Sequence, residues 1–113
     1  MDKLTHYQTL IKQILTEYEK ISLQVPDPDI DEVLMFDDSR SQYLWFNIGW
    51  KNGKRVKAIS VYVRIKNNKI YVEEDWTEEG ITTELLREGV PKEDIVLAFH
   101  APDTRELTEF AIA

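Results

Sequence analysis

Three side chains near the end of the sequence could perform acid–base chemistry: His100, Asp103 and Arg105. They follow an apolar run at residues 95–99, and functional groups often lie just beyond the ends of strands. An imidazole beside a carboxylate and a guanidinium would suit a hydrolase. The alternative is that His100 forms local hydrogen bonds while Asp103 or Thr104 organises a turn. We favour this alternative, because nothing in the sequence marks these groups as buried or perturbed in pKa, as a working acid or base would be.

Other catalytic and metal-binding patterns fail on inspection. Asp27, Asp29, Asp31 and Asp38 imitate the spacing of a calcium loop, but Glu32 stands where that loop needs glycine. No lysine has an acidic residue two positions before it, as a common type of metal-dependent nuclease requires. There is no Gly-x-Ser-x-Gly elbow and no glycine-rich phosphate loop. With no cysteine and two histidines, a zinc site is not expected either, and we predict no cofactor.

Charge is distributed unevenly along the chain. The whole sequence carries a net charge of −7, but residues 73–113 hold 3 basic and 12 acidic side chains, a net of −9. Such a segment repels phosphate backbones and suits a basic protein partner. By contrast, residues 51–72 contain seven basic residues and no acidic one. This basic ribbon could follow a nucleic-acid backbone, or it could be a solvated hairpin. Its candidate DNA contacts are Lys51, Lys54, Arg55 and Lys57.

A long amphipathic helix is expected at residues 2–22. Its apolar residues recur at steps of three and four, as in Leu4, Tyr7, Ile11, Ile14, Tyr18 and Ile21. Pro26 and Pro28 prevent it from continuing. The stripe is wider than a coiled-coil seam, so we favour a helix laid across a sheet over a coiled coil with a second protomer.

Four strands are predicted next, each with apolar residues at alternate positions. They cover residues 32–36, 42–50, 56–65 and 70–74. Asn52 and Gly53 tolerate the two positive φ angles of a type I′ turn, the strongest hairpin signal in the chain. Because the connections are short, we expect the four strands to be antiparallel neighbours in sequence order.

A second helix is expected after the fourth strand. Thr77 is its predicted N-cap, and Ile81 and Leu85 begin its buried stripe. Gly89 suits the left-handed position that follows a helix, and Pro91 prevents continuation.

The sequence ends with two further predicted strands. Residues 95–99 are apolar on both faces and are predicted to form a central strand, while Phe110 and Ile112 indicate a C-terminal strand. The predicted fold is therefore a single α+β domain over residues 1–113. In it, an antiparallel meander packs against the long N-terminal helix, with a second helix before a buried strand. The longest apolar run is far shorter than the roughly 18 residues of a membrane span, and no signal core is evident, so a cytoplasmic protein is expected.

The last third of the chain resembles the XisI family, the fdxN-element excision controlling factors. The resemblance lies in the segments DWTEEGI at residues 75–81 and GVPKEDIVLAFH at residues 89–100, with Pro102, Arg105 and Thr108 after them. It implies a small cytoplasmic accessory factor in cyanobacterial developmental DNA rearrangement. Such a factor acts alongside a site-specific recombinase and a nuclease-like companion, XisH. The resemblance implies no established catalytic residues.

These observations lead to one main hypothesis and two alternatives. The main hypothesis is a non-enzymatic regulatory factor that works through protein–protein contacts, with Trp76, His100, Asp103 and Arg105 as candidate interaction residues. The first alternative is a DNA-binding accessory factor that uses the basic ribbon, and the second is a hydrolase built around His100. Exposed strand edges also make a homo-oligomer a reasonable expectation.

Overall fold

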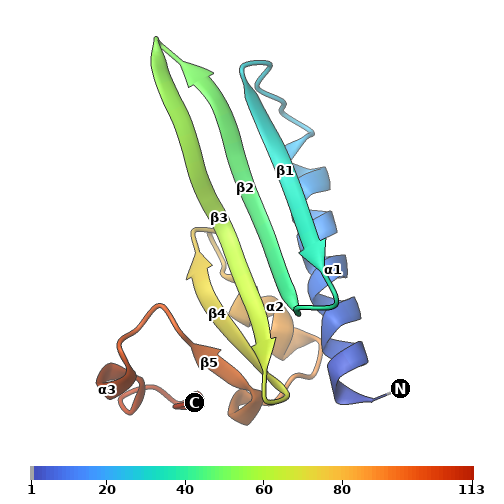
Figure 1. Cartoon of the computed structure of the whole chain (residues 1–113), viewed down its shortest axis with the longest axis vertical. Helices are drawn as coiled ribbons and strands as arrows, with labels where there is room; N and C mark the ends of the chain where they lie inside the picture. Colours follow the sequence, from blue (N-terminus) through green and yellow to red (C-terminus); the bar gives the residue numbers. More distant parts are fainter. Residues whose placement is uncertain (1) are drawn as a thin grey trace.

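The computed structural model describes residues 2–113 and confirms the α+β class (Figure 1). Its elements are α1 (Lys3–Ser22), β1 (Ile30–Asp37), β2 (Gln42–Lys51), β3 (Lys54–Lys66), β4 (Lys69–Asp75), α2 (Ile81–Arg87), the 3₁₀ turn η1 (Lys92–Asp94), β5 (Ile95–Leu97) and α3 (Pro102–Arg105). No helix among these residues is long and apolar enough to cross a membrane.

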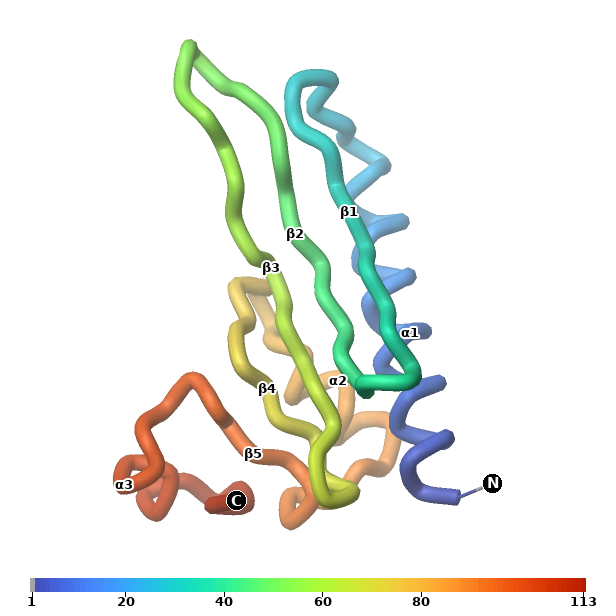
Figure 2. The backbone as a smooth tube through the Cα atoms, viewed as in Figure 1, coloured from blue at the N-terminus to red at the C-terminus, as the bar shows by residue number. Residues whose placement is uncertain are grey.

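The strands form one five-stranded sheet in the order β1-β2-β3-β4-β5. The first four strands are antiparallel neighbours, as predicted, and β5 pairs with β4 in parallel. Asn52 and Gly53 adopt φ of 51° and 75°, which confirms the predicted turn between β2 and β3. The long hairpin of β2 and β3 projects well beyond β4 and β5 (Figure 2).

The prediction of a central strand at residues 95–99 is wrong. Only Ile95–Leu97 form a strand, and it lies last in the sheet order. Ile95 and Val96 are nevertheless fully buried: Ile95 belongs to the core cluster, and the chain end at Ala111 lies beside Val96. Ala111 bridges to Val96 and donates its amide to the Ile95 carbonyl at 2.8 Å, so the predicted C-terminal strand is present as this single bridge. The apolar residues on both faces of this segment thus indicate that it is buried, but they do not indicate a central position in the sheet.

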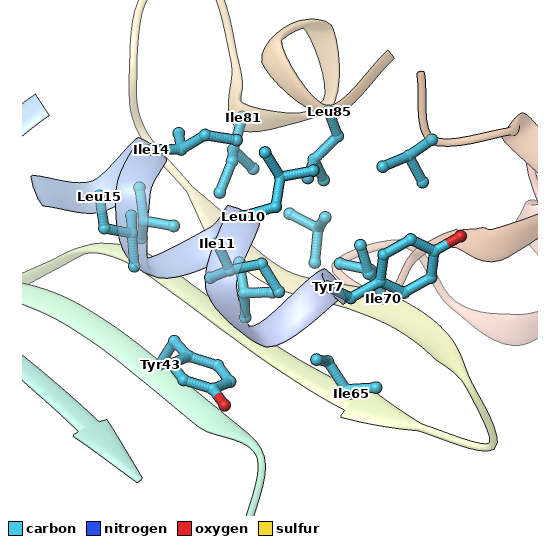
Figure 3. Close-up of a cluster of buried hydrophobic side chains, with 14 of the residues drawn as sticks. Tyr7, Leu10, Ile11, Ile14, Leu15, Tyr43, Ile65, Ile70, Ile81 and Leu85 are labelled. Carbon is cyan, nitrogen blue, oxygen red and sulfur yellow. The ribbon is translucent and has the colours of Figure 1, made fainter. Parts of the chain in front are cut away.

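Helix α1 lies across one face of the sheet, as predicted. Its buried residues meet side chains from the sheet and from α2 in one core (Figure 3). The contributions of α1 are Tyr7, Leu10, Ile11, Ile14 and Leu15. On the sheet the same core takes Tyr43 and Trp45 from β2 and Val61 and Val63 from β3. We call this covered side the inner face of the sheet.

The start of α2 differs from the prediction. Its N-cap is Gly80, with φ of 88°, and not Thr77. The first helical amide, at Ile81, donates to Asp75 Oδ2 at 2.6 Å, while the Thr77 hydroxyl accepts from the Gly80 amide at 3.1 Å. Asp75, at the end of β4, therefore provides the hydrogen-bond acceptor for the first amide of α2, and Thr77 shapes the loop before the helix. The end of α2 is as predicted: Gly89 has φ of 92°, and the Val90 amide returns to the Leu85 carbonyl at 3.0 Å.

A buried carboxylate connects the two ends of the fold. Asp94, in η1, is 8% exposed, accepts a hydrogen bond from the Tyr7 hydroxyl and lies 3.0 Å from Lys3 Nζ. Burial acts to raise the pKa of Asp94, but the hydrogen bonds from Tyr7 and Lys3 outweigh it, and the pKa is lowered overall. The ionised carboxylate therefore stabilises the docking of α1 against the segment that leads into β5.

We expect Asp94→Asn to lower the free energy of unfolding by about 1 to 3 kcal/mol at neutral pH, because it removes a charged, buried hydrogen-bond acceptor. A group with a lowered native pKa contributes its stability above its unfolded pKa, and the contribution is lost as the pH falls through the native pKa. The difference between wild type and variant should therefore shrink below about pH 4. Urea unfolding at several pH values measures this. Glu93→Gln, an exposed neighbour in the same turn, is the control, and an equal loss in both variants would contradict the role given to Asp94.

Candidate interaction surface

An acidic cleft lies between the C-terminal half of α1 and the loop that leads into α2. It encloses about 480 Å³ and is lined by Tyr18, Ile21, Ser22, Trp45, Thr77, Glu78, Glu79 and Glu84. We use the name acidic cleft for this set. The loop takes its shape from the hydrogen bonds of Asp75 and Thr77, and it contributes Glu78 and Glu79, while Glu84 comes from the first turn of α2.

Two aromatic side chains form the wall of the acidic cleft. The rings of Tyr18, from α1, and Trp45, from β2, lie 5.9 Å apart between centroids at 34°. Burial raises the pKa of Tyr18 to about 12, and the nearby charges of Glu84 and Asp75 add to the rise. The part of the rise that comes from these carboxylates reflects their negative charge near the phenol. Aromatic faces beside carboxylates are suited to a cation, such as a lysine or arginine side chain.

The carboxylates of the cleft are only partly neutralised. Arg87 contacts Glu84 and lies 3.7 Å from Glu79, so a single guanidinium serves two of the three glutamates. Glu78 is exposed and has no ion pair within residues 2–113. The nearby Lys20 lies 3.5 Å from Glu17 of its own helix. The cleft therefore keeps unbalanced negative charge at its rim.

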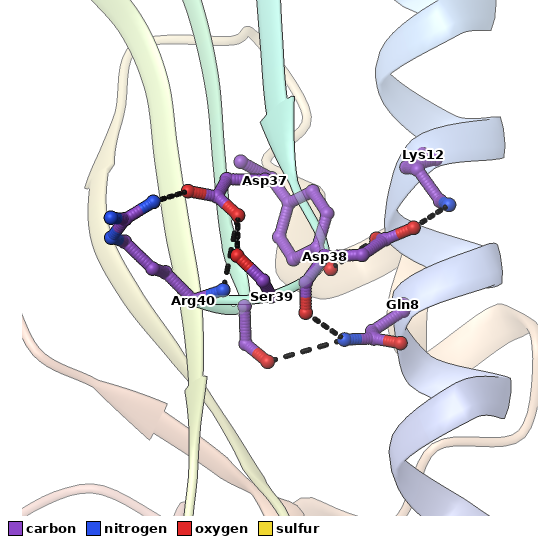
Figure 4. Close-up of polar contacts among 8 residues, drawn as sticks. Gln8, Lys12, Asp37, Asp38, Ser39 and Arg40 are labelled. Carbon is purple, nitrogen blue, oxygen red and sulfur yellow. Dashed lines mark hydrogen bonds and ion pairs between the residues drawn. The ribbon is translucent and has the colours of Figure 1, made fainter.

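Two of the acidic residues that imitate a calcium loop form ion pairs with lysines. Asp27 lies 2.7 Å from Lys51 Nζ, and Asp38 lies 2.7 Å from Lys12 Nζ. Asp38 also accepts from the Tyr43 hydroxyl, and its backbone carbonyl accepts from Gln8 at 2.9 Å (Figure 4). The contacts of Asp38 with Lys12 and Gln8 fasten the turn between β1 and β2 to α1. Within residues 2–113 no group of three or more acidic or histidine side chains is arranged to hold a metal ion.

His100, Asp103 and Arg105 are close in sequence but do not form a catalytic group. Arg105 donates to three backbone carbonyls, at 3.0 Å to His100, 3.3 Å to Ala98 and 3.4 Å to Ile112. No hydrogen bond joins the His100 ring to Asp103 in the described chain, and the ring packs instead against Phe99, with centroids 4.6 Å apart. Arg105 thus holds the C-terminal segment together, a role that was not predicted from the sequence.

Trp76 is a strongly exposed candidate residue. It is 77% exposed, and its backbone amide donates to the Ser60 carbonyl at 2.8 Å. It directly precedes Thr77, which lines the acidic cleft. The structure therefore places Trp76 beside the loop that lines the cleft, whereas His100 and Asp103 belong to the C-terminal segment.

The basic ribbon does not form one continuous surface. Lys51 binds Asp27, Arg55 stacks at 5.3 Å over Trp50, and Arg64 binds Glu73 at 2.7 Å. Lys66 lies 5.0 Å from the ring of Tyr71, and Lys69 contacts the carbonyl of Ala113. Intramolecular partners thus engage most of the ribbon. Lys54 and Lys57, near the hairpin tip, are exposed and have no ion pair within residues 2–113.

Sequence reasoning did not identify the acidic cleft as a site. The net charge of residues 73–113 indicated the correct region, but it could not show which carboxylates come together. Tyr18 fitted the apolar stripe of α1, and Trp45 fitted the alternation of a strand, so neither was recognised as part of a surface. The detectable signal was the run of Glu78 and Glu79 beside a predicted helix start.

Comparisons with known proteins agree over almost the whole chain. The sequence profile of the XisI protein family matches residues 1–112. The crystal structure of fdxN element excision controlling factor XisI from Anabaena variabilis ATCC 29413 is 47% identical, with a TM-score of 0.87, over 99% of this chain and 100% of that one. A XisI-like protein from the same organism is 36% identical, with a TM-score of 0.91, over 97% and 99% of the two chains. No match was found among curated proteins.

We expect Arg105→Lys to loosen the C-terminal segment, because a lysine cannot reproduce the hydrogen bonds of a guanidinium to three carbonyls. The expected loss of stability is about 1 to 3 kcal/mol. Hydrogen exchange at the Ala111 amide, which is bonded to Ile95, should become faster by at least about tenfold. His100→Ala serves as the control and should leave that amide protected. Unchanged exchange in Arg105→Lys would show that Arg105 does not hold this segment.

Proposed function

The chain belongs to the XisI family, and on that premise we propose that it controls excision of a DNA element by binding a basic segment of a partner protein in the acidic cleft. The observation that supports this most directly is the cleft itself, where Tyr18 and Trp45 form a wall below carboxylates that are only partly neutralised. Membership of the family indicates a XisI-like excision controlling factor. The mode of binding to a partner is our proposal.

The chemistry of the cleft favours a lysine or arginine side chain as the bound group. A guanidinium can stack on the ring of Tyr18 while its N–H groups donate to Glu78 or Glu79. The hydrocarbon part of a long basic side chain suits the apolar wall at Ile21 and Trp45. An acidic or neutral segment would leave the carboxylates unpaired and would gain less from the same contacts.

The partner that we propose is a XisH-like, nuclease-like protein, as the family resemblance implies. Excision of DNA needs enzymes that break and join phosphodiester bonds. The described side chains of this protein offer contacts that are better suited to binding than to catalysis, since Arg105 is occupied by carbonyls. In this proposal a companion protein supplies the chemistry, and this chain regulates it by contact.

Direct DNA binding is the second candidate function, and the structure gives it less support. The projecting β2 and β3 hairpin carries Lys54 and Lys57 near its tip, which favours contact with a phosphate backbone. The other basic residues of the ribbon already have partners in the fold. The net charge of −7 also opposes approach to DNA.

We expect Glu78→Gln combined with Glu79→Gln to weaken binding of a purified XisH-like protein by at least about tenfold, equivalent to about 1.4 kcal/mol. The reason is that the variant removes negative charge from the rim of the cleft and leaves its aromatic wall in place. Binding by the wild type should also fall as salt is raised, because charges at an interface rim are screened. Titration calorimetry at two salt concentrations measures both effects.

The matched control is Glu93→Gln combined with Glu106→Gln, which removes the same charge from exposed positions outside the cleft. An equal loss in the control would show that net charge matters and the cleft does not. No binding of the XisH-like protein at low salt would remove the proposal. A DNA gel shift that disappears in Lys54→Glu combined with Lys57→Glu would support the second candidate function instead.

A further inference from the structure

Strand β2 is apolar on both of its faces. Tyr43 and Trp45 point into the core below α1, while Leu44, Phe46 and Ile48 occupy the alternate positions on the opposite side. An antiparallel sheet with one solvated face normally has polar residues on that face. Here the apolar residues extend to both neighbouring strands. We call the side away from α1 the open face.

Strand register arranges the open face in four rows, because paired residues of antiparallel strands lie on the same side of a sheet. Read from β1 through β2 to β3, the rows are Asp31–Ile48–Lys57, Val33–Phe46–Ile59, Met35–Leu44–Tyr62 and Asp37–Gln42–Arg64. The two middle rows are apolar or aromatic, and the two outer rows end in charges. In both outer rows the acidic residue is on β1 and the basic residue is on β3.

Over β1, β2 and β3, nothing in the described chain covers the open face. Figure 1 looks onto it, and no helix or loop passes in front of β1, β2 and β3. Met35 is 57% exposed and Ile59 is 38% exposed, although both belong to the apolar rows. A hollow of about 360 Å³ lies between them, lined in part by Leu44 and Tyr62. An apolar centre with a charged rim is the usual anatomy of a protein interface.

We propose that the open face binds the open face of a second copy of this chain, with a two-fold axis running along β2. Rotation about that axis exchanges β1 with β3 and keeps every row at its own height. Asp31 then faces Lys57 of the second copy, and Asp37 faces Arg64. Phe46 meets Phe46, and Met35 meets Tyr62. Sheets packed face to face in this manner lie about 10 Å apart.

The pattern of charge selects this axis over the other two-fold axis in the plane of the interface. An axis across the strands would place β1 over β1 and invert the order of the rows. Asp31 would then face Asp37, and Lys57 would face Arg64, so that like charges meet at every corner. Only the axis along β2 brings opposite charges together in both outer rows. This self-complementarity is why the occupant is a second copy, in a two-fold arrangement of the kind that most soluble oligomers adopt.

Asp31 and Lys57 are the most informative pair. Asp37 already binds Arg40 at 2.8 Å, and Arg64 already binds Glu73 at 2.7 Å. Asp31 and Lys57 are both exposed and have no ion pair within residues 2–113. Within one chain Ile48 lies between them. A contact between these two charges would therefore form only between two copies of the chain.

A charge exchange between two variants tests the arrangement. In Asp31→Lys, lysine faces Lys57 on both sides of the two-fold axis, and in Lys57→Asp, aspartate faces Asp31 there. We expect each variant alone to dimerise at least about tenfold more weakly than the wild type. In an equal mixture, the two variants restore both opposite-charge contacts. The mixture should therefore form a heterodimer close to wild-type affinity, which native mass spectrometry and sedimentation measure.

Phe46→Asp tests the apolar centre and should give a monomer, with circular dichroism to check the fold. If Phe46→Asp does not fold, the charge exchange tests the proposal by itself, because Asp31 and Lys57 are both exposed and their substitution should not disturb the fold. The control is the pair Asp103→Lys and Glu106→Lys, which should leave dimerisation unchanged. A monomeric wild type at about 100 µM, a dimer unaffected by Phe46→Asp, or a mixture without preferential heterodimers would each overturn the proposal. A dimer formed by pairing of exposed β1 edges would give the second of these results.

Discussion

The sheet has two apolar faces, and the helices of the chain are sufficient to cover only one of them. Tyr43 and Trp45 are buried under α1, whereas Phe46 and Ile48 lie on the side that no helix reaches. This constraint follows from the order of the elements, because α1 precedes the meander and α2 follows it, and both pack on the inner face. Each surface considered above derives from it: the acidic cleft lies where α1 meets the loop before α2, and the open face lies opposite.

The acidic third of the chain divides into structural and exposed carboxylates. Asp75 accepts a hydrogen bond from the first amide of α2. Asp94 accepts one from the Tyr7 hydroxyl and lies beside Lys3. These groups are part of the fold and offer little to a partner. Glu78 and Glu79, in contrast, stand on the rim of a cleft with aromatic walls. A net charge of −9 therefore overstates the negative surface that a partner meets, and the position of each carboxylate matters more than their sum.

Local signals in the sequence predicted the fold better than contacts that span long distances. Asn52 with Gly53 and the end of α2 at Gly89 depend on the backbone preferences of single residues, and both predictions are confirmed. The predicted Thr77 cap is wrong because Asp75 reaches the Ile81 amide across six positions, which no nearest-neighbour pattern encodes. The same holds for the role of Arg105, whose carbonyl partners become neighbours only after the C-terminal segment has folded back on β5. The acidic cleft joins α1, β2 and the loop before α2, so it could not be predicted without the tertiary structure.

The positions of the two surfaces determine how they can act together. A dimer through the open faces leaves α1 on the outside of each copy, because α1 covers the opposite side of the sheet. With about 10 Å between the sheets and a similar distance from each sheet to its helix, the two α1 helices would be about 30 Å apart. One short basic segment cannot reach both acidic clefts across that distance. Each cleft would then bind its own partner molecule, and avidity would arise only for a partner that is itself paired or that carries two basic segments on a long linker.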